Sequence, residues 1–230
     1  MPRADARESP YSERRHVGPR LERPTASSKC VVFTSVIAGH PRDVLASLDP
    51  GAQASSCMRQ EYAVRPSRAG DEGFVHDLAN RVFSAYSRDA RRAIRSILAD
   101  GVTETLVAEL ESLPVGFVVV QYGQLARDFG PWARPTTARI QAIAVRPDVE
   151  GRGIGRRLLE SAEEAARARS SRSLSLATGE KNARARRLFE AAGFVPLVRL
   201  TRYYAGGQTA VLMHRALIEG ILTGSANDVG

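Results

Sequence analysis

The stretch from Arg139 to Phe194 limits the fold more than any other part of the chain. In it, two apolar runs alternate with two segments of helical periodicity. In order these are the apolar run 139–147, a glycine-rich turn at 150–155, the helical segment 156–169, the apolar run 173–178 and a helical segment that closes at 191–194. This order predicts a βαβ crossover followed by a second helix. Such a unit can hold a phosphorylated cofactor.

Regular patterns continue on both sides of this stretch. They predict strands at 61–67, 103–111, 115–123, 195–205 and 209–217, and helices at 71–87 and 88–99. The whole order is β-α-α-β-β-β-α-β-α-β-β. It indicates an α/β or α+β layered domain with a mixed sheet, antiparallel at first and with the βαβ crossover in the middle.

The patterns place one domain at residues 61–217. Residues 1–60 are rich in Arg, Pro, Ser, Ala and Gly and show no sustained period. They predict a mostly disordered extension, apart from one short ordered piece near 31–38. Residues 218–230 are expected to form a loose tail. Because Met58 stands just before the first strand, one hypothesis is that the functional polypeptide begins there.

Composition and charge narrow the class of protein. The 230 residues are 43% hydrophobic and 25% charged, as in ordinary globular proteins. A net charge of +8 suits anionic ligands, but the positive residues are not clustered, which argues against nucleic acid as a partner. Cys30 and Cys57 have no metal spacing, and no metal is expected. Two cysteines and no membrane-length apolar run predict a cytoplasmic protein without a membrane partner.

The glycine-rich turn carries the first functional signal. Gly151, Gly153 and Gly155 lead from a strand end into a helix, whose first N–H groups have no helical partner and attract anions. Arg152 and Arg156 can add charged contacts to a pyrophosphate. The spacing fits neither a Walker loop nor a dinucleotide-binding fingerprint. A plain strand-to-helix turn with a solvated arginine face remains an alternative.

Two segments together resemble one family. AIAVRPDVEGRGIGRRLL, residues 142–159, resembles the acetyl-CoA-binding motif of the GCN5-related N-acetyltransferases (GNAT). Gly153 and Gly155 match the family pattern, while Glu150 stands where glutamine or arginine is usual. NARARRLFEAAGF, residues 182–194, is similar to the second motif of the family. The resemblance extends over about residues 61–217.

The resemblance implies a mixed, mostly antiparallel sheet flanked by helices, with acetyl-CoA as co-substrate. It implies that the acetyl-CoA site contains the strand residues Ile143, Ala144 and Val145, the turn residues Gly151, Arg152, Gly153, Ile154, Gly155 and Arg156, and Asn182 and Phe189 of the second motif. The acceptor would be an amine on a small molecule or a peptide, and a homodimer is compatible with the sequence.

The catalytic groups are less well defined. Many relatives have a tyrosine hydroxyl where this chain has Phe189, and the ribosomal-protein alanine acetyltransferases have a glutamate where it has Ala177. Candidates from the residues are Tyr203 and Tyr204 as acids and Gln141 as a residue that orients a water. For the tyrosines, the favoured alternative is an amphipathic strand with one ring in the core and one outside.

Two functions therefore remain open at the level of sequence. The first is an N-acetyltransferase that transfers an acetyl group from acetyl-CoA to a primary amine by direct attack in a ternary complex. The second is a module of the same fold that binds or senses acyl-CoA without turnover, which the residues Phe189 and Ala177 favour.

Overall fold

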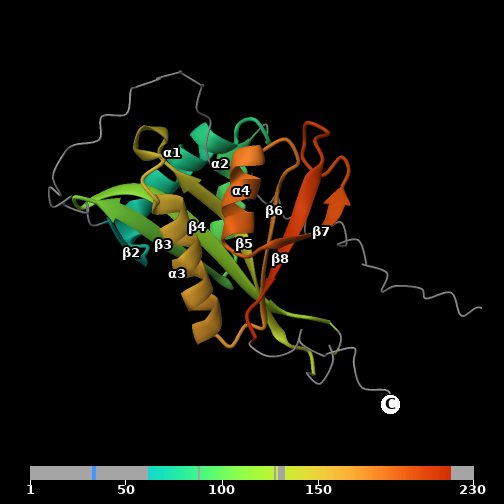
Figure 1. Ribbon diagram of the computed structural model, residues 1–230. Coiled ribbons are helices and arrows are strands. Elements are labelled where there is room, and N and C mark those ends of the chain that lie inside the picture. The colour runs from blue at the N-terminus through green and yellow to red at the C-terminus, as the bar shows by residue number, and fades with distance from the viewer. Residues whose placement is uncertain (1–32, 35–61, 88, 127, 129–132, 219–230) are drawn as a thin grey trace, which may run out of the picture.

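The computed structural model describes residues 33–34, 62–87, 89–126, 128 and 133–218, which form one mixed sheet with helices on both faces (Figure 1). The strands are β1 (Phe33–Thr34), β2 (Tyr62–Pro66), β3 (Thr103–Leu110), β4 (Leu113–Gln124), β5 (Thr136–Val145), β6 (Ser173–Gly179), β7 (Val195–Leu200) and β8 (Ala210–Ala216). The helices are α1 (Glu72–Phe83), α2 (Ala90–Leu98), α3 (Ile154–Ala168) and α4 (Ala183–Ala191), with 3₁₀ turns at Ala69–Asp71 and Pro147–Val149.

The sheet has the strand order β2-β3-β4-β5-β6-β8-β7, with β1 beside β5. β5 and β6 run parallel, as the crossover through α3 requires, and the other neighbours in that order are antiparallel. β1 pairs with β5 in the parallel direction. The predicted mixed, mostly antiparallel sheet and the predicted order of elements from the first strand of the domain onward are confirmed.

Helices cover the two faces in pairs, with α3 and α4 in front of the sheet and α1 and α2 behind it in Figure 1. The front layer buries side chains such as Val118, Ile140, Leu158, Leu174 and Phe189. The back layer buries Leu78, Phe83, Ile94, Phe117 and Ala144. Adjacent residues along β4 alternate between the two layers, which explains why a sheet buried on both faces reads as a continuous apolar run.

The parallel pair opens in the middle of the sheet. β5 and β6 are paired only from Ala138 to Ile140 on the β5 side. Immediately beyond, β5 has a bulge at Gln141, because Val120 of β4 pairs with Ile140 while the preceding residue, Val119, pairs with Ala142. β1 lies in this opening, with Phe33 opposite Ala142 and Thr34 opposite Ile143, and contacts β6 as well.

The structure differs from the predicted boundaries at three places. The helix predicted at 71–87 ends at Phe83, so residues 84–87 lie outside it. The turn before β4 is Glu111–Ser112, where both residues have positive φ, so Pro114 belongs to the strand. β7 ends at Leu200, so Tyr203 and Tyr204 lie in the connection to β8 and not on a strand.

Some predictions lie outside the described residues. These are the extension 1–60 apart from 33–34, the hypothesis that the functional polypeptide begins at Met58, and the tail from 219 onward. In the part of the chain that the structure describes, no helix is long and apolar enough to cross a membrane.

Candidate active site

The glycine turn has the backbone geometry of an anion site. Gly151 and Gly153 adopt left-handed conformations, with φ of 79° and 85°. Gly153 is the N-cap of α3, and the hydrogen bond from Arg157 N to Gly153 O (3.0 Å) closes the first helical turn. The N–H groups of residues 154–156 therefore precede the helical ladder and lie at the positive end of the helix dipole.

A pocket of ≈ 170 Å³ lies in front of these N–H groups. It is lined by Val145, residues 149–151 and 153–156, Arg184 and Leu188, and we call it the cradle pocket. It brings the predicted turn residues, except Arg152, together with the end of β5. Arg184 and Leu188 were not singled out by the sequence, although their i, i+4 spacing puts them on one face of α4.

One acidic side chain lies in this otherwise anion-attracting pocket. Glu150 is only 8% exposed, and its Oε2 is 3.4 Å from Nη1 of Arg184. Burial raises the pKa of Glu150 above its ordinary value, and the positive charge of Arg184 opposes that rise. The predicted Arg156 is 76% exposed and pairs with Glu160 at 3.0 Å, so it lies on the rim.

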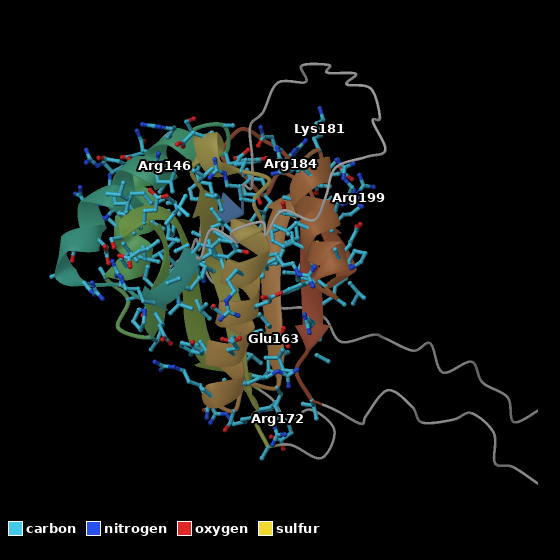
Figure 2. The ribbon with its side chains drawn as sticks, turned by 60° about the vertical axis from the view of Figure 1, so that its left-hand side comes forward. Arg146, Glu163, Arg172, Lys181, Arg184 and Arg199 are labelled. Atoms are coloured by element: carbon cyan, nitrogen blue, oxygen red, sulfur yellow. The ribbon has the colours of Figure 1, made fainter. Side chains whose placement is uncertain are left out.

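Positive side chains gather at this end of the molecule. Figure 2 shows Arg146, Lys181, Arg184 and Arg199 toward one end, and Glu163 and Arg172 toward the other. The cradle pocket lies at the first of these ends, because Arg184 lines it. Three of these four pair with acidic side chains, Arg146 with Asp148, Arg184 with Glu150 and Arg199 with Glu180. The attraction for a phosphorylated ligand therefore comes mainly from the backbone N–H groups of the turn.

The opening of β5 continues from the cradle pocket. Val145 lines the pocket, and Ile143 and Ala144 precede it on the strand. β1 occupies this edge as a short parallel strand, so the backbone of β5 here accepts an extended segment. A ligand with amide groups along an extended chain can pair in the same way.

Asn182 caps the helix that links the cradle to the far side of the site. Its Oδ1 accepts a hydrogen bond from Ala185 N (3.1 Å) at the start of α4. Its Nδ2 donates to the hydroxyl of Tyr86 at 3.4 Å. Because the cap uses the amide oxygen of Asn182, the amide nitrogen is the atom that faces the Tyr86 hydroxyl.

Tyr86 was missed by the sequence analysis. It lies in the turn after α1, and its ring packs against Tyr204 with centroids 4.9 Å apart. A side chain at Gly179 would place its Cβ 2.8 Å from Tyr86 Cε1, so the ring fits only because residue 179 is glycine. Burial raises the pKa of the Tyr86 phenol. No local pattern indicates Tyr86, because its partner Asn182 is 96 residues away.

The two predicted tyrosines lie beside it but have other partners. The hydroxyl of Tyr204 donates to the carbonyl of Ala177 at 3.4 Å, and Tyr204 is almost fully buried. Burial raises the pKa of Tyr204 strongly. The hydroxyl of Tyr203 accepts a hydrogen bond from Nη2 of Arg139 at 3.1 Å. The pair therefore has one ring in the core, that of Tyr204, while Tyr203 is only partly buried.

A second pocket of ≈ 360 Å³ opens on this cluster. It is lined by Tyr86, residues 179–181 and residues 206–209, and we call it the tyrosine pocket. Gln208 Nε2 donates to the carbonyl of Ala85 at 3.2 Å and ties the β7–β8 connection to the end of α1. On the rim, Glu180 pairs with Arg199 at 2.5 Å.

The remaining predicted residues, Gln141 and Phe189, line neither of these two pockets. Gln141 is fully buried at the bulge, where its Nε2 donates to Oε1 of Gln121. Gln121 in turn donates to Asp100 at 2.6 Å. Phe189 is fully buried in the front layer, edge-on to Phe194 with ring centroids 6.1 Å apart.

Comparisons with known proteins identify the same region. Residues 73–194 match the Acetyltransferase (GNAT) family. Over 158 residues, the chain is 28% identical to a Bacillus subtilis (strain 168) protein assigned as a ribosomal protein bS18-alanine N-acetyltransferase, with 68% of this chain and 96% of that protein covered. Over 140 residues it is 29% identical to the thialysine N-epsilon-acetyltransferase of Bos taurus, covering 56% of this chain and 82% of that protein.

Solved structures agree on the fold. The NAA60 protein of Arabidopsis thaliana, in complex with acetyl-CoA, matches with a TM-score of 0.60 at 18% identity, over 70% of this chain and 100% of that one. A chain of the NatC complex bound to Gag peptide and CoA gives 0.59 at 20% identity, over 69% and 99%. The family expected from the two motifs is confirmed: this chain belongs to the GNAT acetyltransferase family and is an acetyl-CoA-dependent N-acetyltransferase.

Proposed function

We propose that this N-acetyltransferase holds acetyl-CoA along the cradle pocket and the open edge of β5, and acetylates a primary amine that enters through the tyrosine pocket. The observation that carries the proposal is the position of α4. Its residues Arg184 and Leu188 line the cradle pocket, and its cap Asn182 contacts Tyr86 of the tyrosine pocket. A donor lying along α4 would present its reactive end to the second pocket.

The donor side is supported by backbone geometry. The pyrophosphate would accept hydrogen bonds from the N–H groups of residues 154–156 at the start of α3. The pantetheine arm would pair with Ile143–Val145, the edge that β1 occupies in part. Arg152 and Arg156 would add charge at the rim.

The reaction needs mostly positioning. The neutral amine attacks the carbonyl carbon of the thioester, a C–N bond forms, and the C–S bond breaks. The nitrogen loses a proton and the sulfur gains one, so that the products are an amide and free CoA thiol. Holding both reactants in one ternary complex removes much of the entropic barrier.

The proposal leaves the acceptor at the level of a primary amine on a small molecule or a peptide. The relatives' names point in both directions, to a ribosomal protein in one case and to thialysine in the other. Ala177 stands where, by the resemblance, the ribosomal-protein alanine acetyltransferases have a glutamate base. Ala177 is fully buried and has no carboxyl group. The acceptor of that relative is therefore not carried over.

The test is the release of CoA thiol from acetyl-CoA in the presence of a panel of amines. The panel contains small primary amines, free lysine and peptides with free N-termini. We expect thiol release that depends on one class of amine, together with acetyl-CoA binding by calorimetry. Binding without thiol release for any amine, or no binding at all, would contradict the proposal.

A further inference from the structure

We propose that Tyr86 is the catalytic acid that protonates the leaving CoA thiolate. This inference rests on the proposed function, because it requires the thioester to lie between the cradle pocket and the tyrosine pocket. It assigns a role to a residue outside both sequence motifs. The hydroxyl that is absent at Phe189 would thus come from the turn after α1.

The role of Tyr86 follows from the start of α4, where Arg184 lines the cradle pocket and the cap Asn182 contacts Tyr86. In the proposed arrangement, a donor with its pyrophosphate at Gly153 and its arm along β5 would run toward the start of α4, where Asn182 is the N-cap. At that point the described side chain in contact with Asn182 is Tyr86, which also lines the tyrosine pocket. Tyr86 therefore lies at the junction where the donor would meet the acceptor.

The hydrogen bonds around the three tyrosines favour Tyr86 as the donor of a proton. Tyr204 already donates its proton to the carbonyl of Ala177. Tyr203 is bound to the guanidinium of Arg139. The Tyr86 hydroxyl accepts from Asn182, and within the described residues it donates to no protein group, so its proton remains for a ligand.

The ring of Tyr86 is held in one place. It packs on Tyr204, fills the space left by Gly179, and stands on a turn that Gln208 ties to the β7–β8 connection. It is half-buried, and burial raises the pKa of its phenol, which keeps it protonated at neutral pH. A fixed, protonated phenol is the state a general acid needs.

The step balances without a further reactant. As the C–S bond breaks, the Tyr86 O–H bond breaks and an S–H bond forms, which leaves a phenolate. The phenolate takes a proton from solvent through the open pocket, and the amine nitrogen gives one to solvent. Tyr86 is thereby restored, and the sum is one amine and one thioester converted to one amide and one thiol.

The first experiment compares Tyr86→Phe with Tyr122→Phe in the full-length protein. Tyr122 is also a partly buried phenol, and it donates to Glu104 at 2.8 Å, outside both pockets. We expect kcat to fall by about 10²-fold in Tyr86→Phe, with KM for acetyl-CoA unchanged, and by less than about threefold in Tyr122→Phe. Thermal denaturation and acetyl-CoA calorimetry verify that both variants are folded and bind the donor.

The second experiment places a fluorinated tyrosine, whose phenol is more acidic, at position 86. The alkaline limb of the kcat profile should move to lower pH, and the same replacement at position 122 should leave it in place. If Tyr86→Phe keeps kcat within about threefold, or if the limb does not move, Tyr86 is not the acid. A wild-type protein that releases no thiol with any amine would instead contradict the proposed function.

Discussion

The two ends of the site are built differently. The residues that line the cradle pocket come from one stretch of the chain, Val145 to Arg156, and from α4, and its anion-binding groups are the backbone N–H groups at the start of α3. The tyrosine pocket is formed by the turn after α1, the end of β6 and the β7–β8 connection, which are far apart in the sequence. A site made of backbone N–H groups can be located in a sequence from its glycines and from the start of a helix. A site made of side chains from distant segments forms only when the chain folds and brings them together.

This difference determines how each end should respond to substitution. In the cradle, most side chains can change, and only a residue that blocks the backbone or reverses the charge should matter. At the tyrosine pocket, the Tyr86 hydroxyl and the Asn182 amide bind each other, so replacing either group should have a large effect. The following predictions test that contrast, beginning with the largest expected effect.

The first prediction concerns Gly153→Asp. A Cβ at this position, where φ is 85°, would lie 3.0 Å from the hydroxyl of Tyr62, and the carboxylate would repel a pyrophosphate. We expect acetyl-CoA affinity to fall by about 30-fold, since the new carboxylate would take the place of the phosphate at the helix terminus, an interaction worth up to ~2 kcal/mol when partly buried. Calorimetry measures the affinity.

The matched control is Gly153→Asn, which has the same shape and backbone strain without the charge. It should lose roughly tenfold less affinity than Gly153→Asp. Equal losses in the two variants would show that strain, and not anion binding, makes glycine necessary at position 153.

The second prediction separates the two ends of the Asn182 amide. Asn182→Asp keeps an acceptor for Ala185 N but replaces the group that donates to Tyr86. We expect kcat to fall by roughly tenfold with unchanged stability, because the carboxylate would bind the Tyr86 proton. Steady-state kinetics and thermal denaturation measure the two effects.

Asn182→Ala removes the cap as well, and should lower stability by about 1 kcal/mol, or about 2–4 °C in Tm. If Asn182→Asp is as unstable as Asn182→Ala, the cap does not depend on the oxygen. If Asn182→Asp keeps full kcat, the contact with Tyr86 has no catalytic role.

The third prediction concerns Glu150, the acidic residue in the cradle pocket. An anionic ligand binds better when Glu150 is neutral, so binding is coupled to proton uptake. Because burial raises the pKa of Glu150 above 4.5, acetyl-CoA affinity should increase as pH falls through that raised pKa, and decrease above it.

Glu150→Gln should tighten acetyl-CoA binding by about two- to fivefold at neutral pH, which corresponds to about 0.3–1 kcal/mol for one charge at a helix terminus. It should also remove this part of the pH dependence. Calorimetry over a series of pH values on both sides of the raised pKa measures both. Weaker binding by Glu150→Gln would mean that Glu150 is needed to orient Arg184.

The smallest effect is expected for Tyr204→Phe. Its hydroxyl donates to the buried carbonyl of Ala177, so its loss should lower stability by about 0.5–1.5 kcal/mol and change kcat by less than about threefold. A kcat loss as large as that of Tyr86→Phe would make Tyr204 the acid and would exchange the roles of the two rings.

The contrast also explains what the sequence could predict. The order of elements in the domain follows from periodicity, and the cradle follows from Gly151 and Gly153 before an amphipathic helix. These signals are local, because each depends on residues within about one turn of one another. Of the predicted positions, Val145, Gly151 and residues 153–156 accordingly line one pocket.

The acceptor side could not be predicted in the same way. Aromatic residues favour strands, and Tyr203 and Tyr204 were expected on one. Their N–H groups both donate to the carbonyl of Gln208 instead, in a turn that Gly207 closes with φ of 75°. Tyr86 had no signal at all, since its partners come from β6, α4 and the β7–β8 connection.

The short strand β1 has a consequence for any measured affinity. Thr34 lies opposite Ile143, one of the residues proposed to pair with the pantetheine arm. Two extended segments cannot use the same backbone groups of β5 at once. If acetyl-CoA pairs with β5 as proposed, the chain would compete with its own co-substrate, and the apparent dissociation constant for acetyl-CoA would equal the intrinsic constant divided by the fraction of molecules in which this edge is open.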